Sequence, residues 1–429
     1  MSQVELGKKA GVLSSGFLAR SGRRAVRALL CRLERGAIEW NEGSERLVFG
    51  NPDSSLRAVV TLHDSRAYAK MFAGGSVGAA EAYADGWWSS PDPAAVVRVL
   101  LQNVDLADGL DGGFSRIRGL VMTLLRPLRD NTRRGSRRNI AAHYDLGNDF
   151  FAEFLDATMT YSCGVFERPE STLAEASEAK LDLICRKLGL GRGSEILEIG
   201  TGWGSFAMHA AERYGCRVVT TTISPSQHAL AKQRVSAAGL GDRIDLLQVD
   251  YRDLPRLLHR RFDHLVSVEM IEAVGHRHLD RYFNTCASLL KDDGTMLLQA
   301  ILIDDRRQAS HRRRPDFIMR HIFPGACLPS QQTIARSIAR ATDLTVRHLH
   351  DLTPHYSRTL RAWRRRLLRN RTRVAAHGYP DRLVRLWDFY LAYCEAGFEE
   401  RYIGDAQYLL ARPGARLDLG VSGQGWRPA

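Results

Sequence analysis

The residues with the clearest chemical potential follow a short apolar run near the middle of the chain. An acid, Glu198, precedes three glycines at alternate positions, Gly200, Gly202 and Gly204. Glycine lets a backbone turn sharply and approach a ligand closely, and the amides at the start of the next helix point toward that ligand. A carboxylate beside such a loop attracts positive charge and repels a pyrophosphate. We therefore expect this loop to bind a ligand that carries positive charge.

The spacing of this loop differs from that of dinucleotide-binding loops. The NAD fingerprint has the spacing GxGxxG, whereas residues 200–204 read GTGWG. The shorter spacing after an acid resembles the first motif of methyltransferases that use S-adenosylmethionine (SAM), a ligand with ammonium and sulfonium groups. From the loop alone, a nucleotide-dependent oxidoreductase and a tight turn without a ligand remain alternatives.

The surrounding pattern predicts an open α/β sheet. Apolar runs of strand length occupy residues 196–199, 216–222, 243–249, 262–268 and 294–303. Ligands of such sheets bind at the carboxyl ends of the strands. The segments expected to face one crevice are therefore 200–204, 222–227, 250–251 and 269–272, together with Gln299. Asp250 and Tyr251 would offer an adenine a hydrogen-bond acceptor and a ring face.

The length of 429 residues allows two domains. We expect a basic N-terminal helix (1–35), a small α+β domain (36–125), a basic linker (126–138), a catalytic domain (139–415) and a C-terminal tail (416–429). The first segment fits either a helix packed on its own domain or a basic amphipathic helix on a membrane. The segment 140–167 mixes aromatic and polar turn residues, and we expect it to wrap the site.

The charge balance favours a polyanionic partner. Lysine and arginine outnumber aspartate and glutamate by 61 to 48, which suits nucleic acid or an acidic membrane surface. The arginines between 361 and 373 form either a solvated helix face or a phosphate-contacting helix. The absence of a long apolar run and of a secretory signal predicts a cytoplasmic protein. Seven dispersed cysteines without a CxxC pair predict neither a disulfide framework nor a metal site.

Seven segments occur in an order that closely resembles the cyclopropane-fatty-acyl-phospholipid synthases. They are HYDLGNDFF, TYSCGVFE, LEIGTGWGS, TTISPSQ, SVEMIEAVG, FIMRHIFPGACLPS and YCEAGF, and the resemblance covers roughly residues 36–412. It implies a Rossmann-like class I SAM methyltransferase domain with a smaller N-terminal α+β domain. It also implies the activity, in which SAM provides a methylene group for the cis double bond of an acyl chain in a membrane phospholipid, with the enzyme peripheral at the inner membrane face.

The resemblance implies a set of cofactor-binding residues, position by position. They are Tyr161, Ser162, Gly200, Gly202, Trp203, Gly204, Thr222, Ser224, Gln227, Tyr251 and Arg252. Glu198 and Asp250 join this set from the chemistry of their side chains. Tyr161 and Ser162 are expected from the resemblance only.

The chemistry of the reaction explains the expected catalytic set. An alkene is a weak nucleophile, so it needs an activated methyl group at short range and no competing water. Methyl transfer leaves a carbocation, and a base must remove a proton from the new methyl group to close the ring. In the family a bound bicarbonate ion is this base. The resemblance implies that the residues holding it are Cys163, Glu272, Gln299, Tyr356 and the backbone of Ile301.

Two of the matching positions are Cys394 and Gln299. Cys394 matches a cysteine sometimes assigned to the active site, although the reaction needs no covalent enzyme intermediate, and a buried core thiol is the simpler interpretation. Gln299 stands where many bacterial members have histidine. Glutamine can donate a hydrogen bond to an anion, but it cannot hold a positive charge or relay a proton. The product is therefore expected to be a cyclopropane or, alternatively, a methyl-branched or methylene chain.

Two other functional classes remain as hypotheses. A nucleic-acid methyltransferase typically carries an Asn/Asp-Pro-Pro-aromatic motif where residues 269–272 read EMIE, so we expect no nucleic acid partner. A lipid-binding protein without turnover is compatible with Gln299. We expect a phospholipid membrane surface as partner, with acidic lipids favoured, and the sequence leaves a homodimer open.

Overall fold

The computed structural model describes residues 19–103, 146–313 and 317–417, which belong to two compact units. The first unit combines the described residues up to 103 with 310–322 and 360–402, and the second combines the remainder. This division differs from the predicted succession of domains, because helix α18 (Asp381–Glu399) packs on α2 (Arg66–Ala84) and α3 (Pro93–Gln102). The linker predicted at 126–138 and the tail from 418 lie outside the described residues.

The first unit is built on a four-stranded sheet with the order β2-β1-β3-β4. Its strands are β1 (Ala37–Glu42), β2 (Glu45–Gly50), β3 (Arg57–Leu62) and β4 (Trp88–Ser89). β1 and β2 form an antiparallel hairpin, and β3 runs parallel to β1. Besides α2, α3 and α18, the unit contains α14 (Phe317–His321) and α17 (Arg371–Ala376).

The N-terminal basic segment packs on this first unit in its described part. Residues 19–30 are helical, and the apolar side chains of Val26 and Leu30 are buried. Arg27 on the same helix donates to Glu42 and Glu45 of the β1–β2 hairpin at 2.9 and 2.6 Å. An apolar face that is already covered is not available to a membrane, so the described part supports the packed interpretation. Residues 1–18 lie outside the description.

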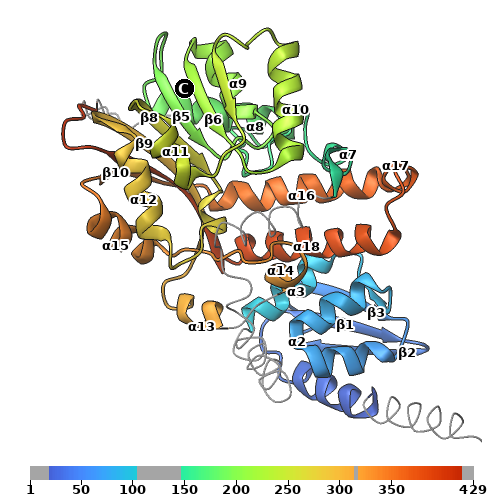
Figure 1. Cartoon of the computed structure of the whole chain (residues 1–429). Coiled ribbons are helices and arrows are strands. Elements are labelled where there is room, and N and C mark those ends of the chain that lie inside the picture. Colours follow the sequence, from blue (N-terminus) through green and yellow to red (C-terminus); the bar gives the residue numbers. More distant parts are fainter. Residues whose placement is uncertain (1–18, 104–145, 314–316, 418–429) are drawn as a thin grey trace, which may run out of the picture. The chain divides into compact units, whose positions relative to one another are not determined.

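The second unit contains a seven-stranded sheet with the order β10-β11-β9-β8-β5-β6-β7 (Figure 1). The strands are β5 (Glu195–Ile199), β6 (Arg217–Thr221), β7 (Ile244–Leu247), β8 (Phe262–Val268), β9 (Leu290–Ile303), β10 (Thr345–Asp351) and β11 (Ile403–Ala411). β5 to β9 pair in parallel, whereas β10 and β11 are antiparallel additions beside β9. This sheet confirms the predicted Rossmann-like α/β class.

Helices cover both faces of this sheet (Figure 1). One face carries α8 (Leu173–Lys187), α9 (Ser205–Tyr214) and α10 (Pro225–Ala237); the other carries α11 (Leu254–Leu257), α12 (Leu279–Ser288) and α15 (Gln331–Ala341). Short turns complete the unit: α7 (Gly147–Ala152), η2 (Tyr251–Asp253) and η3 (Ile271–Ala273). Two helices, α13 (Gln308–Arg313) and α16 (Thr353–Arg369), pass from one unit into the other.

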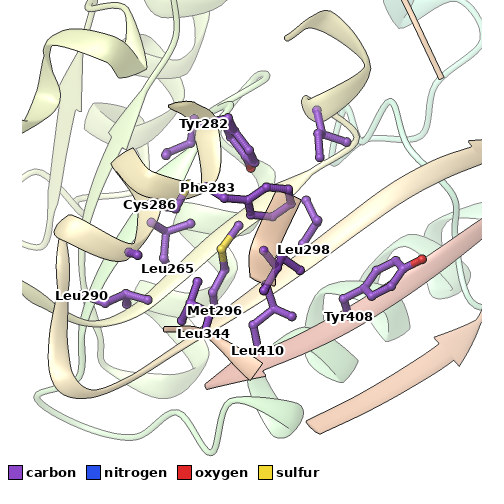
Figure 2. Packing of buried hydrophobic residues seen from close by; sticks show 14 of the residues in the cluster. Leu265, Tyr282, Phe283, Cys286, Leu290, Met296, Leu298, Leu344, Tyr408 and Leu410 are labelled. Carbon is purple, nitrogen blue, oxygen red and sulfur yellow. The ribbon is translucent and has the colours of Figure 1, made fainter. Parts of the chain in front are cut away.

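Successive side chains of β9 belong alternately to the two hydrophobic cores of the unit. Leu297 packs toward α8 and α9, whereas Met296 and Leu298 pack toward α12, as expected for a strand whose successive side chains point to opposite faces. Figure 2 shows Met296 and Leu298 facing Phe283 of α12. Fully burying a side chain such as Phe283 contributes about 1.5–3 kcal/mol to the free energy of folding. The packing on both faces therefore stabilises the sheet.

The sheet register places polar residues side by side on the neighbouring strands β9 and β11. Gln299 of β9 pairs with Val268 of β8 and with Gln407 of β11, and Ile301 pairs with Asp405. Gln299, Gln407 and Asp405 have no exposed surface. Buried polar groups of this kind have to find partners within the protein.

The arginine-rich segment 361–373 falls on α16 and α17. Arg361 and Arg364 donate to Glu395 and Asp388 of α18 at 2.7 and 2.6 Å, so part of the positive charge is used inside the first unit. Arg365 is exposed. Among the described residues no helix has both the length and the apolar character needed to cross a bilayer.

Candidate active site

The glycine loop joins β5 to α9 through three left-handed residues. Gly200, Gly202 and Gly204 have φ angles of 106°, 53° and 88°, which glycine adopts at little cost. A Cβ placed on Gly202 would meet no atom within 4 Å, and one placed on Gly200 would lie 3.3 Å from Cβ of Met270. The loop therefore borders open space and lies directly beside the segment that follows β8. This fits a backbone that receives a ligand.

Glu198 is buried at the end of β5, immediately before this loop. Thr220 donates to its Oε2 at 2.6 Å, and Thr201 lies 2.7 Å from the same threonine hydroxyl. Burial raises the pKa of Glu198 to about 8, against the opposing effects of Thr220 and the charge of Lys180. The carboxyl group is therefore largely protonated near pH 7, and a cationic ligand beside it would favour ionisation. Its predicted contact with SAM stays a prediction.

Trp203 of the glycine loop contacts the aromatic segment 140–167, which is expected to wrap the site. Its ring is buried with its centroid 5.1 Å from that of Phe151, and its Nε1 donates to Oδ1 of Asn148 at 2.7 Å. Arg234 donates to the Trp203 carbonyl at 2.6 Å. The described part of segment 140–167 thus contacts the loop. Trp203 holds the shape of the loop, and its direct contact with SAM stays a prediction.

The three residues predicted after β6 contact one another at the start of α10. Thr222 donates to Oε1 of Gln227 at 2.9 Å, and the Gln227 amide donates to Oγ of Ser224 at 3.3 Å. Ser224 is the N-cap of α10. These bonds satisfy polar groups that are largely buried, so the structure brings the three residues together and gives them a structural role beside any ligand contact.

The predicted adenine-binding pair lies in the turn after β7. Arg252 donates from Nε and Nη2 to the two carboxylate oxygens of Asp250, at 2.8 and 2.6 Å. This bidentate pair fixes the turn. Tyr251 is half-buried, with its ring 5.5 Å from that of Tyr282. The carboxylate of Asp250 therefore already accepts hydrogen bonds from Arg252, and its contact with an adenine stays a prediction.

Tyr161 and Ser162 are neighbours with different environments. The Tyr161 ring lies 5.4 Å from Phe151 and stacks on Phe323 at 6.5 Å. Ser162 is buried and accepts a hydrogen bond from Nζ of Lys180 at 2.9 Å. Lys180, on α8, has 2% exposure. A buried ammonium needs negative partners, which the next strand ends provide.

Glu269, the first residue after β8, is the meeting point of three hydrogen-bond donors. The backbone amide of Cys163 donates to Oε1 at 2.9 Å, and Nε2 of Gln299 donates to the same oxygen at 2.7 Å. The hydroxyl of Tyr356 donates to Oε2 at 2.5 Å. Three donors from three segments favour the ionised carboxylate.

The backbone of Glu269 is left-handed, with a φ angle of 48°. For a residue with a Cβ this conformation costs roughly 1–2 kcal/mol, and such residues cluster at functional sites. The Glu269 amide donates to the carbonyl of Gln299 at 2.9 Å, so the last hydrogen bond of the β8–β9 pair holds the turn. The strained backbone conformation of Glu269 therefore orients its carboxylate toward the three donors.

Gln299 is oriented by a chain of side-chain hydrogen bonds. Lys187 donates to Oε1 of Gln407 at 2.8 Å, and Nε2 of Gln407 donates to Oε1 of Gln299 at 3.0 Å. With its oxygen used as an acceptor, Gln299 directs its amino group to Glu269 at 2.7 Å and to Asp405 at 3.1 Å. A flipped amide would lose these bonds. Gln299 is thus a fixed donor to two acids.

Glu272 and the backbone of Ile301, two positions that the resemblance implies, contact each other. The Ile301 amide donates to Oε1 of Glu272 at 2.6 Å, while Oε2 is buried without a hydrogen-bond partner among the described residues. Burial, followed by the charge of Glu269, raises the pKa of Glu272 to about 8. Glu272 is therefore mainly a neutral acid near pH 7, and its O–H group is available to a ligand.

The buried charges of the site can be assigned to individual residues. Burial raises the pKa of both Glu269 and Asp405. The hydrogen bonds of Tyr356, Cys163 and Gln299, together with the charge of Lys180, oppose this rise at Glu269. Asp405 instead faces the charge of Glu269 and keeps its pKa well above the usual range. We assign the negative charge to Glu269 and the proton to Asp405, with Lys180 as counter-charge.

The two cysteines of the predicted catalytic set do not behave as nucleophiles. Cys163 contributes its backbone amide to Glu269, and burial raises the pKa of its thiol well above the usual range. A neutral buried thiol is a poor nucleophile. Cys394 is a buried residue of α18 and belongs to the first unit, whereas the acids described above belong to the second.

Sequence analysis missed several residues of this cluster. Lys180, Asp405 and Gln407 are not among the predicted site residues, and Glu269 is among them only as part of segment 269–272. Asp405 and Gln407 alternate within the otherwise apolar strand IGDAQYLLA, and Lys180 stands on a helix face beside buried Leu181 and Ile184. Polar residues at core positions were the available signal.

The residues of the cluster do not fit a separate bicarbonate ion. The three donors expected to hold it, from Cys163, Gln299 and Tyr356, donate to Glu269 instead. The Ile301 amide donates to Glu272. A further anion would therefore find these donors occupied and a carboxylate beside it, which would repel it. The arrangement itself can accept a proton at a fixed carboxylate next to a loop suited to a cationic ligand.

Comparison with known families and proteins assigns this chain to a family. A family model described as mycolic acid cyclopropane synthetase matches residues 131–408. Tuberculostearic acid methyltransferase UfaA1 of Mycobacterium tuberculosis is 41% identical over 347 residues, which cover 79% of this chain and 80% of that protein. Cyclopropane-fatty-acyl-phospholipid synthase of Escherichia coli is 32% identical over 374 residues, which cover 84% and 89%.

A solved structure supports the same relationship. The mycolic acid cyclopropane synthase CmaA1, complexed with SAH and CTAB, has a TM-score of 0.59 and 34% sequence identity with this chain. The match covers 64% of this chain and 98% of that chain. The part of the chain that aligns is therefore comparable in extent to a whole relative of this class.

Proposed function

Because the chain belongs to the mycolic acid cyclopropane synthetase family and is a SAM-dependent lipid methyltransferase, we propose that it acts on the cis double bond of an unsaturated acyl chain in a membrane phospholipid. The first product that we propose is a cyclopropane ring. SAM supplies an electrophilic methyl group, and the alkene supplies the electron pair. Ring closure then requires the removal of one proton.

The observation that carries this proposal is the position of Glu269 relative to the glycine loop. Glu269 follows β8, the neighbour of β5, and the adjacent Met270 lies against Gly200. A cation bound at the loop would therefore share one edge of the sheet with a carboxylate that accepts three hydrogen bonds. An alkene reaction needs a donor and a base within one site.

The residues around this edge have distinct proposed roles. The loop backbone and Glu198 would hold the charged end of SAM. The aromatic rings of Tyr161 and Phe323, which stack 6.5 Å apart, would exclude water from the reacting carbons. The neutral Glu272, whose Oε2 has no partner among the described residues, would donate a hydrogen bond into the same site.

A methylene-branched chain is the second candidate product. It is supported by the 41% identical relative, which is named a methyltransferase of tuberculostearic acid, and by glutamine at position 299. Proton removal also completes this product, after a hydride shift along the chain. A saturated methyl branch would need a separate hydride donor, because proton loss leaves an unsaturated product. Ring closure needs no hydride shift and therefore stands first.

The proposed function is tested by following the methyl group. The protein is incubated with methyl-labelled SAM and vesicles of a monounsaturated phospholipid, and vesicles of the saturated lipid with the same head group are the matched control. We expect label in the acyl chains of the unsaturated lipid only. Equal labelling of both lipids, or labelling of added RNA or DNA, would contradict the substrate.

We include binding to an acidic membrane surface in this proposal. The net charge is +13, and exposed residues on α16 include Arg365, Leu368 and Arg369. Cations beside an exposed apolar side chain suit a phospholipid surface. Binding to sedimented vesicles should increase with anionic lipid and weaken with salt. Replacing Arg365 and Arg369 together by glutamine should reduce it, and binding that is indifferent to salt and to both arginines would contradict this part.

A further inference from the structure

We propose that the carboxylate of Glu269 is the general base of the reaction, so that the enzyme carries its own base and needs no bound bicarbonate. This inference rests on the proposed function, because it assigns a residue to the proton removal that follows methyl transfer.

The hydrogen-bond donors around Glu269 form an anion-binding site, and the carboxylate of Glu269 occupies it. A backbone amide (Cys163), a side-chain amide (Gln299) and a phenol (Tyr356) converge on its two oxygens within 2.9 Å. These donors come from segments almost two hundred residues apart, and all point at one carboxylate. Glu269 also has a left-handed backbone, with a φ angle of 48°, and residues with such a backbone cluster at functional sites.

Glu269 is also the acid of the cluster best placed to reach a substrate. Asp405 has no exposed surface and accepts a hydrogen bond from the amino group of Gln299. Glu272 is buried and accepts from the Ile301 amide. Glu269 is half-buried as a residue, and its neighbour Met270 lies 3.3 Å from a Cβ built on Gly200 of the glycine loop, so Glu269 stands next to the segment that is expected to bind the ligand. A base has to reach the proton that it removes.

The chemical step balances without a further reactant. The bond between sulfur and the methyl carbon breaks, and its electron pair stays on sulfur. The π pair of the alkene forms the new bond to the methyl carbon and leaves a cation on the neighbouring carbon. Glu269 takes a proton from the methyl group, and the C–H pair closes the ring. The proton then leaves Glu269 for solvent, which restores the carboxylate.

Gln299 acts as a positioning residue in this step. Its amino group donates to both Glu269 and Asp405, at 2.7 and 3.1 Å, and its own oxygen is held by Gln407. Gln299 therefore keeps the two acids at a fixed separation. At this separation only one of them is ionised, and the charge lies on Glu269 while Asp405 keeps its proton. A permanently neutral donor suits an internal carboxylate, whereas a protonated histidine would bind the carboxylate as an ion pair and weaken it as a base.

The inference is tested with two substitutions and a chemical rescue. Glu269→Gln keeps the shape and removes the base. Glu269→Gly removes the side chain, and because glycine adopts a φ angle of 48° freely, this variant should fold well and leave the three donors open to an added anion. Turnover is measured in buffer freed of carbon dioxide and then with added bicarbonate or formate. Glu178→Gln, a change of an exposed glutamate on α8, is the matched control.

We expect the wild type and Glu178→Gln to be indifferent to the removal of carbon dioxide. Both Glu269 variants should lose about 10²- to 10⁴-fold in turnover, with SAM affinity nearly unchanged. Bicarbonate or formate should restore at least a tenth of the lost activity to Glu269→Gly and none to Glu269→Gln, because only glycine leaves room for the ion.

Three results would overturn the inference. One is a wild type that stops when carbon dioxide is removed, since it would then use bicarbonate. Another is full turnover in both Glu269 variants. The last is a Glu269→Gly variant that no anion rescues, which would give Glu269 a structural role. If the wild type itself puts no label into acyl chains, the proposed function fails rather than this assignment.

Discussion

Replacing Glu272 by glutamine should stabilise the protein at alkaline pH while it damages turnover. Glu272 is largely buried, its Oε1 accepts from Ile301 at 2.6 Å, and its Oε2 has no partner among the described residues. Glutamine has the same shape and can accept the same hydrogen bond through its carbonyl oxygen. It cannot ionise, and this is the property that the experiment isolates.

The expected magnitude follows from the raised pKa. Burial and the charge of Glu269 raise the pKa of Glu272 from 4.5 to about 8, which corresponds to about 5 kcal/mol. Between these two values the folded chain holds a proton that the unfolded chain has lost, so the free energy of unfolding falls as pH rises. This contribution is complete below pH 4.5 and is lost as pH passes through about 8. Glu272→Gln escapes the loss.

The assay is urea unfolding of the SAM-free wild type and variant, followed by tryptophan fluorescence at several pH values. The two proteins should have similar free energies of unfolding near pH 5, and the variant should gain up to about 5 kcal/mol on the wild type by pH 9. In parallel, turnover should fall by about tenfold or more while SAM affinity changes little, because Glu272 stands beside Glu269 and outside the glycine loop.

A stability difference that does not change with pH would refute this reasoning, because Glu272 would then not be a buried neutral acid. Equal losses in turnover and in SAM affinity would also refute it, since they would place Glu272 at the cofactor. Glu178→Gln, on the surface of α8, should show neither effect and serves as the control for a lost charge.

Three further predictions test neighbouring parts of the site. Gln299→Leu should lower the free energy of unfolding by about 3 kcal/mol or more, because buried partners such as Gln407 lose hydrogen bonds; a small change in the urea midpoint would contradict this. Lys180→Met should raise the pKa of the nearby carboxyls and move the rising limb of the pH–turnover profile to higher pH, whereas an unmoved profile would remove Lys180 as counter-charge. Asn148→Ala should cost about 1–2 kcal/mol and weaken SAM binding in calorimetry, because Trp203 loses its acceptor at 2.7 Å; unchanged SAM affinity would separate Trp203 from the cofactor loop.

The central sheet could be predicted because its strands are continuous apolar runs. The run 262–268 coincides with β8, and the glycine loop follows β5 as expected. β9 begins at Leu290, earlier than the predicted residue 294, because polar residues at its start obscure the pattern. β10 and β11 were not predicted. β10 reads TVRHLHD at the edge of the sheet, with most side chains exposed or half-exposed, so it lacks an apolar signature. In β11 the buried polar residues Asp405 and Gln407 interrupt the apolar run.

The site could be predicted in its outline and not in its connections. The resemblance supplied Glu272 with Ile301, and the structure joins them. The hydrogen bonds of Glu269 link residues 163, 269, 299 and 356, which no local pattern relates. Burial of Lys180 depends on how α8 packs against the sheet, and its length of side chain would suit an exposed position equally well. Such features follow from tertiary packing rather than from spacing along the chain.

The central claim is that the methyl group of SAM reaches an acyl double bond and then loses one proton to the enzyme. Mass spectrometry of lipids after reaction with SAM that carries a fully deuterated methyl group tests it most directly. We expect acyl chains that have gained one carbon and only two of the three deuterium atoms, since one deuterium leaves with the base. Chains that retain all three, or deuterium confined to the head group, would contradict it.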